Sequence, residues 1–217
     1  MNEELSASQS KFWDRAAGTK TFSHPLDHAR FVREVAADAA MLDYGCGRGR
    51  LCGELVQRGF ANVVGVDYSP EMIEAAKRDH PTLNVSVVDG SVLPFADESV
   101  DAVLLFAVLT CIPTDAGQRE LMAQISRVLK CGGLLLISDY PLQTDARNVE
   151  RYAAYAQEFG AYGTFRLPDG GVVRHHPREW FTELLHGYSI REEIDMDATT
   201  MNGNPARIVQ IWARREV

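Results

Sequence analysis

The chain has 217 residues, of which 46% are hydrophobic and 24% are charged, so its composition is that of an ordinary globular domain. Its formal charge of −8 disfavours nucleic acid as the main partner, because affinity for a phosphate backbone comes from clustered lysine and arginine. The longest apolar run, residues 102–109, is too short to cross a bilayer, and the acidic start MNEEL is unlike a secretory signal, so we expect a cytoplasmic protein with no membrane partner.

The first part of the chain predicts a cover, a helix and then a series of strands. The loosely patterned N-terminal segment, about residues 5–28, is interpreted as a cover over a site. Apolar residues spaced along one helix face follow it, namely Phe31, Val32, Val35, Ala36 and Ala39. From residue 41 short apolar runs alternate with helical patterns, which is typical of βαβ units around a parallel sheet. Five strands are predicted, at Met41–Tyr44, Asn62–Val66, Asn84–Val88, Val100–Phe106 and Leu134–Ser138.

Two helices between these strands have recognisable ends. Residues 69–71, Ser-Pro-Glu, supply an N-cap, a first-turn proline and an early acid for a helix that residues 80–81, His-Pro, terminate. The next helix carries one apolar stripe over residues 121–129. It is predicted to end at Lys130 and the glycine pair 132–133.

The remaining segment departs from the βαβ alternation. Residues 142–176 contain a helical pattern and a Pro-Asp-Gly-Gly turn, and we interpret them as a cap insertion. A helix near Arg178–Leu185 and an antiparallel pair of strands, around Tyr188–Ile194 and Ala206–Ala213, follow. Four arginines of the cap fit either a surface helix with paired charges or a pocket for an anionic or aromatic molecule; they are Arg147, Arg151, Arg166 and Arg174.

The turn after the first strand points to a nucleotide-type ligand. Its three glycines, Gly45, Gly47 and Gly49, let the backbone approach a ligand at the start of a helix. Their spacing differs from the dinucleotide motif G-x-G-x-x-G, because Arg50 stands where the third glycine of that motif would fall. Asp43, just before the turn, would suit a cationic group better than a pyrophosphate.

Acidic residues at the ends of the next two strands narrow the choice of ligand further. Asp67 ends the second strand, where a carboxylate can accept hydrogen bonds from a ribose. Asp89 follows the third strand, with Gly90 and Ser91 behind it, where a carboxylate can accept an adenine amino proton. Together with Asp43, these residues predict a site for a cationic adenosine compound.

On these motifs the sequence resembles the class I S-adenosylmethionine-dependent methyltransferases. The matching stretches are LDYGCGRG, VVGVDYSPEMIEAAK, VSVVDGSVLPFADESVDAVLLFAVL and ISRVLKCGGLLLIS, and they cover about residues 30–140. The similarity is greatest to methyltransferase type 11 and to the ubiquinone and menaquinone biosynthesis methyltransferases. It implies one domain over residues 1–217 with an α/β, Rossmann-like doubly wound fold. In that fold a mostly parallel seven-stranded sheet has an antiparallel last strand and helices on both faces.

The resemblance also implies roles for single residues toward S-adenosylmethionine. Residues near its methionine part would be Asp43, Gly45, Cys46 and Gly47. Asp67 would bind the ribose, with Tyr68 beside the adenine, and Phe106 would lie near the sulfonium. The adenine edge would be read by Asp89, Gly90 and Ser91.

The expected reaction is methyl transfer to a small-molecule acceptor by in-line attack on the sulfonium methyl, with S-adenosylhomocysteine as product. No catalytic residue is identified; His28, Tyr140 and His175 are acceptor-side candidates because of their placement near strand ends or in the cap. No metal site is expected, because the cysteines lack zinc spacing. The histidine pairs 24/28 and 175/176 are interpreted as solvent-facing or capping.

Three alternatives remain open at this point. A module that binds the cofactor and catalyses nothing would carry the same motifs. An NAD-dependent oxidoreductase would use a similar turn. A nucleic-acid base methylase of the same fold would have an Asn/Asp-Pro-Pro-aromatic motif after the fourth strand, where this chain has FAVLT.

Overall fold

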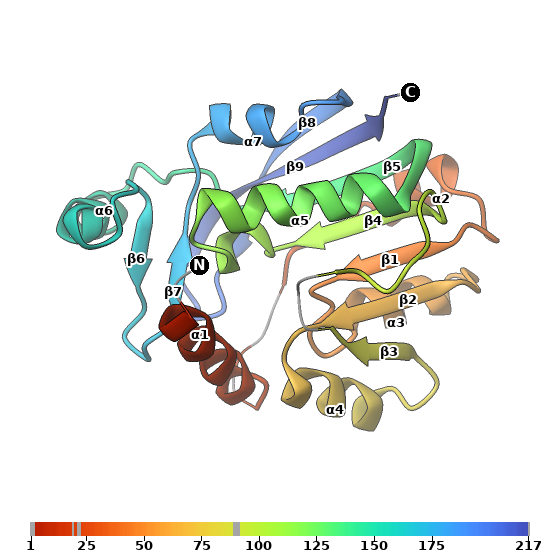
Figure 1. Cartoon of the computed structure of the whole chain (residues 1–217), viewed down its shortest axis with the longest axis horizontal. Helices are drawn as coiled ribbons and strands as arrows, with labels where there is room; N and C mark the ends of the chain where they lie inside the picture. The colour runs from red at the N-terminus through yellow and green to blue at the C-terminus, as the bar shows by residue number, and fades with distance from the viewer. Residues whose placement is uncertain (1–2, 19, 21–22, 89–91, 217) are drawn as a thin grey trace.

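A seven-stranded sheet forms the centre of the described part of the chain (Figure 1). The structure, a computed structural model, describes residues 3–18, 20, 23–88 and 92–216. The strands of this sheet are β1 (Met41–Tyr44), β2 (Val63–Asp67), β3 (Asn84–Val87), β4 (Val100–Phe106), β5 (Leu129–Asp139), β8 (Tyr188–Thr199) and β9 (Pro205–Arg215). Their order is β3-β2-β1-β4-β5-β9-β8, with β1 to β5 parallel and β9 antiparallel to both neighbours. The predicted doubly wound sheet with an antiparallel last strand is confirmed.

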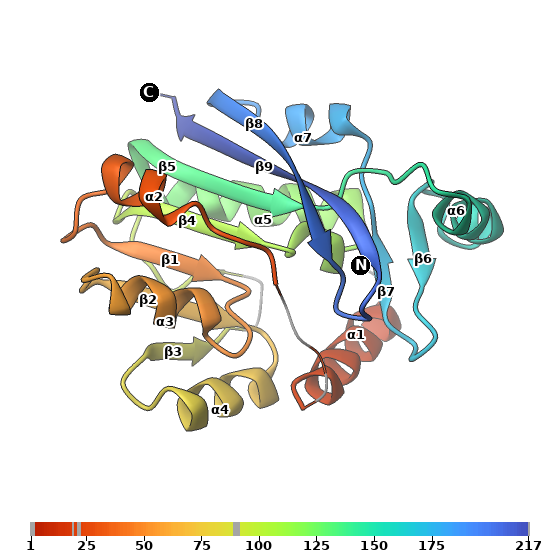
Figure 2. The same ribbon diagram turned by 180° about the vertical axis from the view of Figure 1, so that it is seen from behind.

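Helices lie on both faces of this sheet, as Figures 1 and 2 show from opposite sides. One face carries α5 (Asp115–Val128) and α7 (Arg178–Leu184); the other carries α2 (His28–Glu34) and α3 (Arg50–Gln57). The helix α4 (Pro70–Asp79) packs beside β2 and β3. Strands covered on both faces are expected to be apolar throughout, which explains the continuous apolar runs of β4 and β5.

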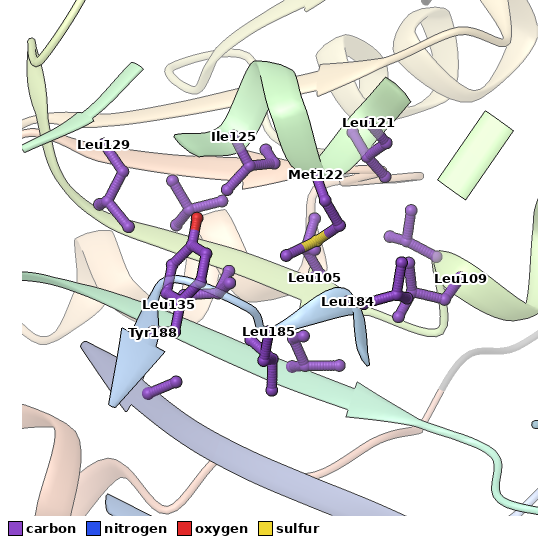
Figure 3. Packing of buried hydrophobic residues seen from close by; sticks show 14 of the residues in the cluster. Leu105, Leu109, Leu121, Met122, Ile125, Leu129, Leu135, Leu184, Leu185 and Tyr188 are labelled. Atoms are coloured by element: carbon purple, nitrogen blue, oxygen red, sulfur yellow. The ribbon is translucent and has the colours of Figure 1, made fainter. Parts of the chain in front are cut away.

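The core therefore has two layers that share the central strands. Leu105 and Leu135 point toward α5 and pack with Ile125, as Figure 3 shows. Leu104 and Leu136, their neighbours along the strands, belong to the cluster on the opposite face. This alternation follows from the period of two in a β-strand. Each fully buried leucine contributes about 2 kcal/mol relative to an exposed one.

Two predicted helix boundaries are wrong. The helix before β1 ends at Glu34, because Val35 already has extended dihedrals, and Val32 is half exposed. Val35 and Ala39 are buried, but from non-helical chain. The helix α5 ends at Val128, and the chain turns directly into β5 because Leu129 pairs with Val100. Lys130 and the glycine pair 132–133 thus belong to a strand.

A group of elements outside the seven-stranded sheet lies beyond the carboxyl ends of β1, β4 and β5 (Figures 1 and 2). It consists of α1 (Glu3–Ala16), the short helix η1 (Leu109–Cys111), α6 (Ala146–Phe159) and the hairpin of β6 (Thr164–Arg166) and β7 (Val172–Arg174). In open α/β sheets, ligands bind at this edge. In the described segments every helix is too short or too polar to span a bilayer.

The helix α1 is fixed at both of its sides. The Gln9 amide donates to the Val172 carbonyl at 2.6 Å and accepts from the Val172 N–H at 2.9 Å, which links α1 to β7. The Ser69 hydroxyl, at the N-cap of α4, donates to Asp14 at 2.6 Å. The helix therefore connects the hairpin with the first residues of α4.

Candidate functional site

The glycine turn predicted from the sequence connects β1 to α3. Gly45, Gly47 and Gly49 all have positive φ angles, of 73°, 53° and 79°. A Cβ atom on Gly45 would lie 2.7 Å from Cγ2 of Val108, which is closer than carbon atoms approach. Glycine is thus required at position 45 by backbone conformation and by space.

Asp67 organises this turn from the end of β2. Its carboxylate accepts the Gly47 N–H and the Ser69 N–H, both at 2.9 Å. Burial raises the pKa of Asp67, and the N–H donors oppose that shift. A carboxylate has about four lone-pair sites, so Asp67 can still accept hydrogen bonds from a ligand.

Asp43 lies deeper, with 2% of its surface exposed. The Cys52 thiol donates to it at 3.2 Å. Burial raises the pKa of Asp43 to about 6, although the positive charge of Arg50 favours the ionised form. A buried carboxylate of this kind is costly without a cationic or donating partner, and a cationic ligand would supply one.

A pocket of about 470 Å³ opens around the turn and the ends of β1, β2 and β4. Of the predicted cofactor-binding residues, those that line it are Asp43, Gly45, Cys46, Gly47, Asp67, Tyr68 and Phe106. The structure thus brings these seven side chains and backbone segments together at one edge of the sheet. Asp89, Gly90 and Ser91 lie outside the described residues.

A second pocket of about 70 Å³ adjoins the first. Trp13, Ala107 and Cys111 line both pockets, so the two are neighbours across these residues. Its other walls come from widely separated parts of the chain: residues 23–24, the end of β5, α6, the hairpin of β6 and β7, and the loop between β8 and β9. We call it the second pocket below.

The three acceptor-side candidates do not share one place. His28 contacts Glu54 at 2.9 Å and lines neither pocket. Tyr140 and His175 both line the second pocket and stack with ring centroids 5.1 Å apart. Burial raises the pKa of Tyr140 and lowers that of His175 well below its usual range.

For three of the four paired histidines, the interpretation as solvent-facing or capping is wrong. His24, His175 and His176 are buried, with at most 4% of their surface exposed. His176 contacts Gln118 at 2.8 Å between α5 and β7. His24 lines the second pocket, and sequence reasoning missed it as a site residue because no local motif surrounds it.

The four cap arginines divide into two pairs. Arg166 forms an ion pair with Glu158 at 2.5 Å, as the paired-charge interpretation expects, whereas Arg174 is buried in β7 and forms an ion pair with Asp115. Arg147 and Arg151 instead line the second pocket.

Comparisons with known proteins point to methyltransferases. A family described as methyltransferase domain matches residues 42–137. A demethylmenaquinone methyltransferase of Beutenbergia cavernae is 30% identical over 159 residues, which are 73% of this chain and 59% of that protein. A probable tRNA methyltransferase 9B of Homo sapiens is 27% identical over 143 residues, which are 66% of this chain and 28% of that protein.

Among solved structures, a SAM-dependent methyltransferase from Methanosarcina mazei has a TM-score of 0.82 at 23% identity, over 91% of this chain and 100% of that one. This likeness shows the fold. The matched stretch 42–137 contains the glycine turn, Asp43 and Asp67, which are the features of the first pocket. The chain therefore carries a class I S-adenosylmethionine-dependent methyltransferase domain over the matched residues 42–137, and the methyl donor of this class is S-adenosylmethionine.

Proposed function

We propose that the chain transfers a methyl group from S-adenosylmethionine to a small-molecule acceptor. The observation that carries the proposal is the meeting of the two pockets at Trp13, Ala107 and Cys111. A donor in the first pocket and an acceptor in the second would then face each other near the end of β4. When bound, the donor supplies an electrophilic methyl carbon, and the chain contributes positioning and exclusion of water.

The residues of the first pocket fit this donor. Asp67 offers free lone pairs for ribose hydroxyls, and Tyr68 offers an aromatic surface beside them. Asp43 and the glycine turn from Gly45 to Gly47 lie where the cationic methionine part would bind. Phe106 would complete the site near the methyl group, and Asp89, Gly90 and Ser91 are proposed to read the adenine.

The elements over the pockets fit the proposed cover and cap. Trp13 of α1 and His24 belong to the cover, about residues 5–28, and Arg147, Arg151 and His175 to the cap, about residues 142–176. We propose that both close the acceptor side of a single domain. A cytoplasmic location without membrane contact is part of the same proposal.

Transfer RNA is the second candidate acceptor, because probable tRNA methyltransferases are among the relatives. The formal charge of −8 speaks against it. The second pocket is also small and lined by the cover and cap, which suits a small ring better than a polynucleotide.

The test is methyl transfer from donor labelled on the methyl group. The purified chain is incubated with pooled small metabolites in one arm and pooled tRNA in another, and S-adenosylhomocysteine and labelled product are measured. We expect turnover in the metabolite arm and none with Asp67→Ala. Turnover with tRNA alone would favour the second candidate, and donor binding without any S-adenosylhomocysteine would favour a module that only binds the cofactor. Tight NADH binding without donor binding would favour an oxidoreductase.

A further inference from the structure

Two positive side chains of the second pocket are more weakly paired with acids than the other cap arginines are. Arg147 is 3.8 Å from Asp145, at the limit of an ion pair, and is exposed. Among the described residues, no carboxylate forms an ion pair with Arg151. Its guanidinium lies 3.6 Å from the centre of the Phe165 ring and donates to Asn148.

The surroundings of Arg151 favour a bound anion. The side chain is half-buried, and burial lowers its pKa, although nearby Tyr152 and the negative charge of Asp145 oppose that shift. Its Nε–H is buried and has no acceptor among the described residues. A carboxylate is the planar, two-oxygen partner that matches a guanidinium.

His24 supplies a proton acceptor in the same pocket. Its Nδ1 lies 3.1 Å from both the carbonyl oxygen and the hydroxyl oxygen of Ser138, and because the carbonyl can only accept, we assign the proton to Nδ1. The other nitrogen, Nε2, then has a free lone pair. It is buried and has no partner in the part of the chain that the structure describes. Burial lowers the pKa of His24 to about 4, so the imidazole is neutral at physiological pH.

The other titratable side chains of this pocket are less suited to accept a proton. Nδ1 of His175 is occupied by the Tyr152 hydroxyl at 2.5 Å. That hydroxyl oxygen also accepts the Gln143 N–H, so its own proton is available for Nδ1. Tyr140 has a raised pKa and remains a neutral phenol. Its ring packs edge-on against His24 with centroids 4.8 Å apart and helps to hold the imidazole in place.

We propose that the second pocket binds a small aromatic acceptor with an anionic group and a weakly acidic hydroxyl, the anion held by Arg151 and the hydroxyl proton accepted by Nε2 of His24. This inference rests on the proposed methyl transfer and makes the product an O-methyl ether. Trp13, Tyr140 and Phe165 form the aromatic walls around such a ring.

The step balances in atoms and charge. The O–H bond breaks and its proton goes to Nε2 of His24, while a lone pair of the oxygen forms the new bond to the methyl carbon. The carbon–sulfur bond breaks, and its electron pair stays on sulfur as a neutral thioether. One positive charge moves from the sulfonium to the imidazole, so the site keeps its net charge. Loss of the sulfonium charge strengthens the base as transfer proceeds.

Equilibrium binding tests the role of Arg151 without turnover. Titration calorimetry compares the three hydroxybenzoates with the matching hydroxybenzamides on the chain loaded with S-adenosylhomocysteine. We expect at least one acid to bind about tenfold more tightly than its amide, and this preference to vanish in Arg151→Met. The control Arg166→Met removes an arginine of the same cap that pairs with Glu158, and it should change nothing. Equal binding of acids and amides would overturn the anion site.

Turnover tests the role of His24. The variant His24→Asn can still donate to the Ser138 carbonyl but has no basic nitrogen. With a hydroxybenzoate we expect kcat to fall about 100-fold or more at unchanged KM. A mercaptobenzoate, whose thiol is already ionised at mildly alkaline pH, should be methylated by His24→Asn nearly as fast as by the unmodified chain.

The outcomes separate this inference from the function on which it rests. If the chain does not bind S-adenosylmethionine, the proposed function itself fails. If donor binding and methyl transfer occur but neutral acceptors serve equally well, only the anion site fails. Equal slowing of hydroxyl and thiol acceptors in His24→Asn, or no O-methylation of any hydroxybenzoate that binds, overturns the assignment of His24 as the base.

Discussion

The two pockets of this molecule are built in different ways. The first uses the ends of adjacent parallel strands, with Asp43, Gly45 and Asp67 each close in sequence to the strand that positions it. The second collects His24, Arg151 and the loop between β8 and β9 from distant parts of the chain. Under the proposed function, the sheet edge would hold the methyl donor, and the segments above it would select the acceptor. Variants of each pocket should therefore have separable effects.

The largest effect is expected at Asp67. Replacing it by alanine removes hydrogen bonds from a carboxylate to the donor, each worth about 1.5–3 kcal/mol, so affinity for S-adenosylmethionine should fall at least about 100-fold in calorimetry. The control is Asp97→Ala, which removes an exposed acid that pairs with Arg127 before β4. A loss below about threefold at Asp67, with an unchanged melting temperature, would contradict the role of this strand end.

The next prediction compares two reasons why a glycine is needed in the glycine turn, namely a steric clash of a Cβ atom and a positive φ angle. Gly45 and Gly132 have nearly equal φ angles, of 73° and 74°, but only Gly45 faces a close neighbour, Val108. Alanine at Gly132 should cost about 1 kcal/mol of unfolding free energy, and alanine at Gly45 about 2–3 kcal/mol. Urea unfolding measures both. Adding Val108→Ala should recover part of the loss at Gly45 only; equal costs at the two glycines would disprove the steric argument.

One buried titratable group in each pocket should change the free energy of unfolding with pH, and the two changes should have opposite signs. His24 has a folded pKa of about 4, below the unfolded 6.5, so it lowers stability as pH falls through this window. Asp43 has a folded pKa of about 6, above the unfolded 3.8, so its cost is present above pH 6 and disappears as pH falls. Relative to the unmodified chain, His24→Asn should gain stability in acid and Asp43→Asn above neutrality, each by about 2 kcal/mol.

Unfolding free energies at about pH 4.5 and about pH 7.5 check this sign difference. The groups that bear on His24 are the Ser138 carbonyl and the positive charge of Arg50. If both variants gained stability at the same one of these two pH values, the predicted opposite pH dependence of the two pockets would be wrong.

The smallest effect concerns Trp13, one of the three residues that line both pockets. Of the three tryptophans, Trp13 lines both pockets, whereas Trp180 and Trp212 are buried in the core. Donor binding should change tryptophan fluorescence, and Trp13→Phe should abolish most of that change. With Trp180→Phe the change should persist. A signal that survives in Trp13→Phe would place the response elsewhere.

The different construction of the two pockets also explains which parts of the structure could be predicted from the sequence. The sheet, the glycine turn, Asp43 and Asp67 depend on local patterns, namely strand periodicity and acids at strand ends, and these features lie where they were expected. His24 could not be found in this way, because its place in the second pocket depends on contacts with Ser138 and Tyr140, which are near it only in the folded chain. The end of α5 was misplaced because the pairing of Leu129 with Val100 overrides the glycine pair as a stop signal.

The attachment of α1 has a thermodynamic consequence. Gln9 ties this helix to Val172 in the cap, Asp14 ties it to the start of α4, and Trp13 between them touches both pockets. A ligand that binds in one pocket and orders α1 lowers the entropy cost of ordering α1 when a second ligand binds in the other pocket. Donor and acceptor affinities should then be linked by one coupling free energy, equal in both directions.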